Sequence, residues 1–246
     1  MIIGIGVALD QQKVIASIAA LNGVAEVICY TSTDLPPSPL YRVVRSDSPE
    51  CALISDLRDG VIDAAVRGSL PANATLGLLR NMMQVEHLER IALLETVSGQ
   101  KFLLAPVGVD EGWTIAQRVS LVEKARKIAG RFGLSSEVAV LSGGRYGDVG
   151  RHSIVDQSLA AGELVAKVAG AIHYEIRIED AVESCGVVIA PDGIAGNLIF
   201  RTLTFLGGGK GHGAPVVNID KIFIDTSRAS PDYTNALLLA VSMFDW

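Results

Sequence analysis

Short apolar runs alternate with amphipathic stretches along nearly the whole chain. The runs are rich in β-branched residues, as buried strands are, and the stretches between them repeat apolar residues at helical spacing. The opening shows one such unit: residues 2–9 predict a strand, 12–22 a helix that ends at Gly23, and 25–30 a second strand. This order predicts an α/β fold of mainly parallel sheets with flanking helices.

The alternation continues to the end of the chain. Further strands are predicted at 42–45, 61–66, 90–94, 101–106 and 138–142, at 174–179 as a half-exposed edge strand, and at a run that ends at Asp225. Further helices are predicted at 48–60, 73–85, 114–132, 153–168 and 198–206. The two central strands fit either a hairpin or a crossover between domains. The Arg and Lys residues of helix 114–132 predict a solvated face.

Length and composition favour a compact protein. The 246 residues are 49% hydrophobic with a mean hydropathy of +0.37, enough for one large core or two smaller ones. No apolar run reaches the ~20 residues that span a bilayer. No basic segment precedes the apolar start, so neither a membrane partner nor a secretory signal is predicted, and the expected location is cytoplasmic.

Charge and ligand-type residues exclude two further classes. The net charge of −6 argues against a nucleic-acid partner, whose binding face is usually basic. Cys29, Cys51 and Cys185 form no Cys-x-x-Cys pair and are expected as thiols, the first and last of them buried in apolar runs. The four histidines do not stand at metal-ligand spacing, so no metal is predicted; they are His87, His152, His173 and His212.

Four loops follow predicted strands and carry glycine, arginine or both. They lie around Arg67-Gly68-Ser69, Gly143–Gly150, Asp192–Asn197 and Ser227-Arg228. Ligands of open α/β sheets bind at the carboxyl ends of the strands. A glycine-rich turn before a helix also leaves backbone N–H groups for an anion. The sequence therefore predicts a phosphate or acyl phosphate ligand.

The segment from Pro191 to Arg228 carries a resemblance to a known family. Its order of Pro-Asp, Gly-Asn, a helix, Leu-Gly-Gly, Ala-Pro and Asp-x-Ser-Arg resembles the C-terminal part of phosphotransacetylases and phosphotransbutyrylases. Asp192–Asn197 is similar to the Asp-Gly-x-x-Gly-Asn of PlsX acyltransferases, and Asp63-Ala-Ala-Val-Arg-Gly resembles an earlier strand end of the family. The resemblance covers most of the chain.

The resemblance implies a two-domain fold, itself similar to isocitrate and isopropylmalate dehydrogenases. The domains expected from it are 1–92 plus 222–246 and 93–221, with a cleft between them. Within the superfamily, the size, the Gly-Gly-Lys-Gly-His-Gly-Ala-Pro run and the Asp-Thr-Ser-Arg-Ala ending resemble the methanogenesis marker protein 4, or MtxX, group of methanogenic archaea. That group carries a methyltransferase label.

The same resemblance implies catalytic residues. Ser227 and Arg228 match a Ser-Arg pair that contacts the acyl phosphate and stabilises charge on the acyl group. Asp232 matches the base that deprotonates the thiol of coenzyme A, although it stands two residues nearer the arginine and Ala229 replaces a glycine. A helix start, with Ser230 as the N-cap and Asp232 in the first turn, explains these residues without chemistry.

Nine further residues are candidates for substrate binding. They are Arg67, Gly68, Ser142, Gly143, Gly144, Arg145, Asp192, Gly193 and Asn197. Structural roles stay open for several of them. Asn197 can hold its loop through the backbone, Asp192 can cap a helix, and Arg145 can simply be solvated.

Three functions follow from this reading. The leading one is acyl transfer between phosphate and a thiol or related acceptor, with coenzyme A or another thiol as the ligand. The second is a methyltransferase or methyltransferase subunit, although no S-adenosylmethionine loop, zinc ligand set or corrinoid motif stands in the sequence. The third is a non-catalytic ligand sensor or assembly factor, which the altered spacing at Asp232 favours. A homodimer is also expected, since the family pairs through its second domain.

Overall fold

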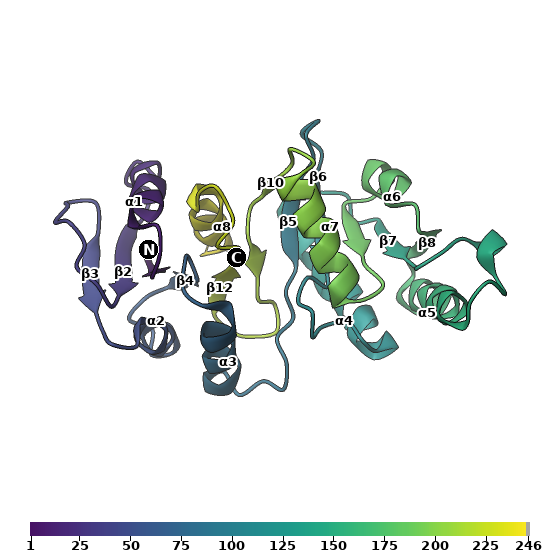
Figure 1. Ribbon diagram of the computed structural model, residues 1–246, viewed down its shortest axis with the longest axis horizontal. Coiled ribbons are helices and arrows are strands. Elements are labelled where there is room, and N and C mark those ends of the chain that lie inside the picture. The colour runs from purple at the N-terminus through teal and green to yellow at the C-terminus, as the bar shows by residue number, and fades with distance from the viewer. Residues whose placement is uncertain (245–246) are drawn as a thin grey trace. The chain divides into compact units, whose positions relative to one another are not determined.

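The computed structural model describes residues 1–244, which divide into two compact units (Figure 1). Unit 1 consists of residues 1–88 and 212–244, so it is built from both ends of the chain. Unit 2 is the intervening segment, Glu89–Gly211. The expected boundaries, after residues 92 and 221, differ from these by four and ten positions.

Unit 1 contains a six-stranded sheet with the order β11-β12-β4-β1-β2-β3. The strands are β1 (Ile2–Val7), β2 (Glu26–Thr31), β3 (Arg42–Arg45), β4 (Ala64–Val66), β11 (Ala214–Pro215) and β12 (Ile222–Asp225). All neighbours are parallel except β11 and β12. The carboxyl ends of the five parallel strands therefore meet at one edge.

Two pairs of helices cover the sheet of unit 1. They are α1 (Gln11–Ala19) with α8 (Thr234–Phe244) on one face, and α2 (Pro49–Arg58) with α3 (Ala72–Met82) on the other (Figure 1). The central strand β1 is buried on both faces, which explains why its sequence is continuously apolar. Cys29 of β2 is buried and free, as predicted.

Unit 2 contains a second six-stranded sheet, with the order β10-β5-β6-β9-β7-β8. The strands are β5 (Ala92–Glu95), β6 (Lys101–Ala105), β7 (Val138–Leu141), β8 (Ile172–Glu175), β9 (Val187–Ile189) and β10 (Lys210–Gly211). Strands β6, β9, β7 and β8 are parallel, and β5 pairs antiparallel with both β6 and β10. The two central strands thus form a hairpin rather than a crossover.

Helices again cover both faces of this sheet. They are α4 (Ile115–Arg131) with α5 (Ser153–Ala169) on one face, and α6 (Ile178–Ser184) with α7 (Gly193–Phe205) on the other; a 3₁₀ turn spans Tyr146–Asp148 (Figure 1). Helix α4 begins with a capping box, in which Thr114 and Gln117 bond each other's backbone N–H. The α/β class with two mainly parallel sheets is therefore confirmed.

Two predicted elements differ from the structure. The strand predicted at 174–179 was wrong after its first two residues, because β8 ends at Glu175 and α6 begins at Ile178. Acidic residues in the first turn of α6, Glu179 and Asp180, favour a helix start there. Helix α7 begins at Gly193, five residues before the predicted position, so the glycine-rich turn belongs to the helix itself.

Candidate functional site

The carboxyl edge of unit 1 is held together by polar contacts between its loops. The Ser69 hydroxyl accepts hydrogen bonds from the backbone N–H groups of Ala8 (2.9 Å) and Leu9 (3.1 Å). The Thr226 hydroxyl donates to the carbonyl of Gly68 at 2.9 Å. Gly68 has a φ of +59°, and a Cβ there would stand 2.2 Å from the carbonyl oxygen of Gly6, so only glycine fits. Gly68 therefore shapes the edge.

Arg67 is buried inside this edge and is used by the fold. Its Nε donates to Asp225 at 2.5 Å and its Nη1 to the carbonyl of Leu70 at 2.8 Å, and the residue is 4% exposed. A buried guanidinium needs such partners, because an unpaired charge is costly away from water. Arg67 thus joins the end of β4 to the end of β12. Because its guanidinium is engaged in these contacts, little of its hydrogen-bonding capacity is left for the substrate binding that the sequence suggested.

The segment after β12 fixes the backbone of Arg228 and leaves its side chain outside. The Lys13 ammonium donates to the carbonyls of Arg228 (3.0 Å) and Ser230 (3.1 Å) and lies 5.0 Å above the ring of Tyr233. The Ser227 hydroxyl accepts from the N–H of Ala229 at 3.2 Å. Arg228 is exposed, and no salt bridge within residues 1–244 involves its guanidinium.

Asp232 caps the approach to α8. Its Oδ1 accepts from the backbone N–H of Thr234 at 2.8 Å, and its side chain is exposed. The sequence placed Ser230 at the N-cap, whereas the helix begins four residues later, at Thr234, and Asp232 supplies the capping oxygen. The predicted helix start is therefore wrong in position, because Ser230 and Asp232 both precede α8, and Asp232 bonds the first residue of the helix from outside it.

In unit 2 the loop after β6 encloses a buried ion pair. Glu111 is 1% exposed; its Oε1 accepts from Arg90 Nε at 2.6 Å, and its Oε2 accepts from the N–H groups of Arg90 and Gly108, both at 3.2 Å. Burial raises the pKa of Glu111, and the Arg90 charge opposes that rise. Arg90 also lies 3.4 Å from Asp110, whose side chain is 73% exposed.

The motif Asp192–Asn197 packs the start of α7 onto that loop. Asp192 Oδ1 accepts from the N–H of Ala195 at 2.8 Å, and Asn197 Nδ2 donates to the carbonyl of Val107 at 3.0 Å. A Cβ on Gly193 would stand 1.6 Å from the carbonyl oxygen of Gly108, and a Cβ on Gly196 would be equally obstructed by Pro106. The predicted open glycine turn is therefore wrong here: the glycines permit close packing, and the two polar side chains take their structural alternatives.

The second glycine loop, after β7, is partly filled by its own contacts. The N–H of Gly143 donates to Ser158 Oγ at 2.8 Å, and a Cβ on Gly144 would stand 2.6 Å from Val155 Cγ1. Arg145 is exposed, while its backbone N–H donates to Asp148 at 2.9 Å. Of the predicted residues in this loop, the Arg145 side chain is the one that reaches solvent.

Ser142 directly follows β7. Its hydroxyl belongs to a network of hydrogen-bonded side chains that the sequence did not predict. Its Oγ lies 3.0 Å from His173 Nε2, and His173 Nδ1 lies 3.0 Å from Glu163 Oε2. The Tyr146 hydroxyl donates to the same Glu163 oxygen at 2.6 Å, which lowers the pKa of Glu163 and raises that of Tyr146 to about 12. Ser142 itself is 1% exposed, so these hydrogen bonds hold the loop in place from its buried side.

Three buried charged residues were missed by sequence reasoning: Glu89, Glu111 and Arg118. Glu111 lies in a loop, where nothing marks it as buried. Arg118 had a signal, because it stands on the apolar stripe of α4 with Ile115, Val122 and Ala125. The solvated face predicted for this helix is therefore wrong for Arg118, which is 5% exposed.

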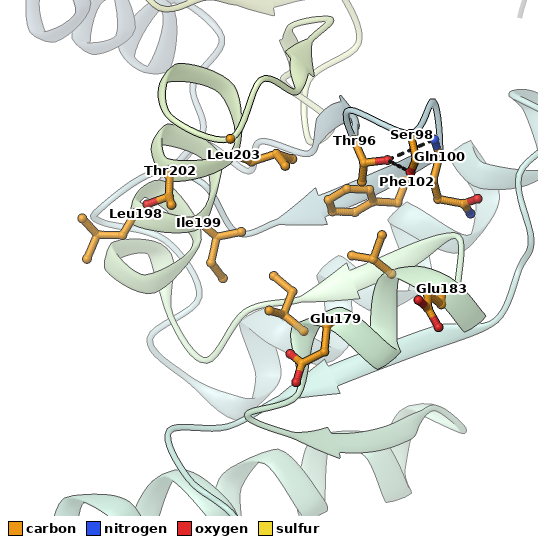
Figure 2. A pocket seen from close by; sticks show the side chains of 13 residues that line it. Thr96, Ser98, Gln100, Phe102, Glu179, Glu183, Leu198, Ile199, Thr202 and Leu203 are labelled. Carbon is orange, nitrogen blue, oxygen red and sulfur yellow. Dashed lines mark hydrogen bonds between the residues drawn. The ribbon is translucent and has the colours of Figure 1, made fainter.

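A separate apolar hollow of about 720 Å³ lies in unit 2, away from the predicted residues (Figure 2). Apolar side chains of α6, α7 and the β5–β6 hairpin line it, among them Phe102, Leu198, Ile199 and Leu203. Hydroxyls of Thr96 and Ser98, which bond each other at 2.8 Å, and the carboxylates of α6 stand around these apolar groups. The hollow has no cation to hold a phosphate.

Neither a metal-ligand cluster nor a membrane-spanning helix is present within residues 1–244. No group of three or more His, Cys, Asp or Glu side chains in that range could hold a metal ion. No helix in the same range has the length and apolarity to cross a bilayer.

Comparison with curated proteins identifies relatives of this chain. It is 43% identical to a Methanosarcina barkeri protein named "Putative methyltransferase mtx subunit X", over 91% of this chain and 82% of that one. It is 36% identical to a Methanopyrus kandleri protein named as an uncharacterized methyltransferase, over 97% and 98% of the two chains. The chain belongs to this family of methanogen proteins. No protein-family model matches it.

Comparison with solved structures defines the fold. The branched-chain phosphotransacylase of Enterococcus faecalis is similar over 99% of both chains, with a TM-score of 0.75 and 18% identity. A Streptococcus pyogenes phosphotransacetylase is similar over 100% of this chain and 94% of that one, with a TM-score of 0.66 and 14% identity. The fold of this methanogen family is thus phosphotransacetylase-like, as the motif resemblance implied.

The Arg90–Glu111 pair predicts a contrast between two neighbouring carboxylates. Glu111→Ala should lower the free energy of unfolding by about 3–5 kcal/mol, because it leaves the largely buried Arg90 without its main partner. Asp110→Ala, the matched control, removes an exposed carboxylate from the same arginine and should cost about 1 kcal/mol or less. Urea unfolding of both variants tests this, and equal losses would contradict a buried supporting role for Glu111.

Proposed function

We propose that this protein binds a phosphate or acyl phosphate at the carboxyl edge of unit 1 and transfers the acyl group to a thiol or related acceptor. The observation that carries the proposal is the state of Arg228. Three contacts from Lys13 and Ser227 hold the backbone there, while the guanidinium stays exposed and without a salt bridge in the described chain. A fixed backbone that presents a permanent cation is well suited to phosphate oxygens.

In the proposed reaction, a thiolate sulfur attacks the acyl carbon of the acyl phosphate. The C–S bond forms, the bond from that carbon to the phosphate oxygen breaks, and phosphate leaves with the electron pair. Arg228 and the hydroxyl of Ser227 would hold the phosphate and the charge that develops on the acyl oxygen. Asp232 would accept the thiol proton as general base.

The sequence also suggested anion-binding residues within unit 2. Among the residues suggested there, Arg145 is exposed and keeps its charge available. Ser142, Gly143, Asp192 and Asn197 already use a polar group within unit 2. We therefore keep Arg145 as the candidate anion-binding residue of unit 2, considered by itself, and assign the others to shaping the loops.

A second candidate function is methyl transfer. It is favoured by the names of the relatives, which read "Putative methyltransferase mtx subunit X" or "Uncharacterized methyltransferase" at 36–46% identity. It would place an S-adenosylmethionine or a methylated carrier where the first proposal places an acyl phosphate. The two proposals therefore predict different ligands.

Thermal unfolding with a panel of ligands tests both. Acetyl phosphate, inorganic phosphate or coenzyme A should raise the melting temperature, because a ligand of the native state stabilises it. Arg228→Ala should reduce that rise without changing the ligand-free Tm, since the side chain is exposed. Arg80→Ala, an exposed arginine in the last turn of α3, is the matched control and should respond as the wild type does.

Two results would count against acyl transfer. A rise with S-adenosylmethionine alone would support methyl transfer instead. A rise with acetyl phosphate that is equally large in Arg228→Ala would remove Arg228 from the site.

The role of Asp232 can be separated from its role as a cap. Asp232→Asn keeps an oxygen for the N–H of Thr234 but cannot accept a proton, so acyl transfer should fall by about 10²–10⁴-fold with little change in Tm. Asp232→Ala should lose the cap as well, at about 1 kcal/mol. Activity would be measured as thioester formation from acetyl phosphate and coenzyme A. Full activity of Asp232→Asn would leave Asp232 as a helix cap only.

The outer face of α7 supports a homodimer as the partner. Leu198 on this helix and Leu206 directly after it are 60% and 84% exposed, and Leu198 lines the hollow of Figure 2. Exposed Arg201 on the same helix can meet the α6 carboxylates Glu179 and Glu183 of a second copy, as a two-fold interface requires.

A charge placed on this face should separate the two copies. Leu198→Glu should convert a dimer into a monomer in size-exclusion chromatography with light scattering. Leu164→Glu on α5, where the leucine is 47% exposed on the opposite face of the sheet, should leave the mass unchanged. A monomeric wild type, or an unchanged mass for Leu198→Glu, would contradict this interface.

A further inference from the structure

Arg118 is a buried arginine that the fold does not pair. Arg67 is paired with Asp225 and Arg90 with Glu111, each at 2.6 Å or less. Arg118 is as deeply buried as Arg67, at 5% exposure. Its Nε is enclosed and has no hydrogen-bond partner, and no salt bridge within residues 1–244 includes its guanidinium.

The position of Arg118 directs its side chain to the carboxyl edge of the unit 2 sheet. It is the fourth residue of α4, which follows β6 and packs on β6 and β9. Side chains of a helix lean toward its N-terminus, and this N-terminus lies at the carboxyl ends of the parallel strands. Asp192, which lies between β9 and α7 as the N-cap of α7, is the charged group whose field acts on Arg118.

Asp192 does not neutralise the guanidinium by direct contact. Its Oδ1 is bonded to the N–H of Ala195 at 2.8 Å as the cap of α7. Burial lowers the pKa of Arg118, and the Asp192 charge offsets only part of this. Because an arginine stays protonated in proteins, the fold retains an enclosed positive charge without a bonded counter-ion.

Such an arrangement costs stability unless something else supplies the acceptor. An apolar residue of similar size would fill the stripe of α4 between Ile115 and Val122 without burying a charge. We propose that Arg118 binds an oxyanion group of a ligand, a phosphoryl or a carboxylate group, at the carboxyl edge of unit 2. This site goes beyond the proposed function, which places a phosphate on Arg228 in unit 1, and it does not depend on that assignment.

The proposed site predicts opposite effects of Arg118→Met on the Tm in the absence and in the presence of an anion. Without a bound anion, Arg118→Met should raise the Tm, by about 2–4 °C for a protein of this size, since it removes an uncompensated buried charge. With the anion, the same variant should lose the stabilisation that the parent protein gains. If Arg118 instead supported the fold, Arg118→Met would lower the Tm of the protein without a bound anion.

The experiment measures Tm in an anion-poor zwitterionic buffer and in rising concentrations of inorganic phosphate or acetate. All proteins carry Arg228→Ala, so that an anion held by Arg228 adds nothing to the response. The parent is compared with Arg118→Met, with Arg118→Lys, which keeps the charge, and with Lys127→Met. Lys127 is exposed on the same helix, so this control removes one positive charge from α4 without touching the site.

The expected result is a phosphate- or acetate-dependent rise of Tm in the parent and in Lys127→Met. The apparent affinity should fall by about tenfold or more in Arg118→Met, because a charge-assisted hydrogen bond is lost. Response to phosphate alone would assign a phosphoryl group, and response to both anions would assign a carboxylate-sized pocket. A lower anion-free Tm for Arg118→Met, an unaltered anion response in that variant, or no response of the parent to either anion would each overturn the proposal.

Discussion

The buried ion pair between Arg67 and Asp225 is the contact on which the edge of unit 1 depends. It joins the ends of β4 and β12, which lie 158 positions apart in the sequence and side by side in the sheet. A buried pair adds little net stability, because both ions lose hydration, but leaving one ion unpaired costs about 3–5 kcal/mol. The pair therefore fixes which strand ends meet. It also fixes the start of the segment that carries Ser227 and Arg228, which come shortly after Asp225 in the sequence.

Unit 2 uses the same device with additional close packing. Arg90 and Glu111 form the buried pair, and Glu111 also receives the backbone N–H of Gly108. Gly193 and Gly196 then let the start of α7 approach that loop at a distance which no Cβ would permit. In both units, ion pairs and hydrogen bonds engage most polar groups at the carboxyl edge, and glycines permit the close packing of its loops. The cations that remain outside these networks are the ones left for a ligand.

Much of the fold could be predicted from the sequence, because apolar periodicity reflects burial directly. Strand β3 lies where it was predicted, and the alternation of runs gave both sheets. The prediction of a strand at 174–179 failed because a short helix start with alternating charges resembles an edge strand in sequence. Glu111 and the contact between Ser142 and His173 could not be predicted, since each depends on segments that only the folded chain brings together. Arg118 could have been, from its place on an apolar stripe.

The motifs that carried the family resemblance separate into two physical kinds. Asp192, Gly193, Gly196 and Asn197 cap, pack and tether α7, so their presence follows from the fold and says little about a reaction. Ser227 and Arg228 differ, because the fold holds their backbone while the guanidinium makes no salt bridge in the part of the chain that the structure describes. A residue that stabilises its own fold can persist after the chemistry has changed. A cation that the fold holds in place without pairing it has no such structural reason to persist, so we propose Arg228 as the residue at which the resemblance bears on function.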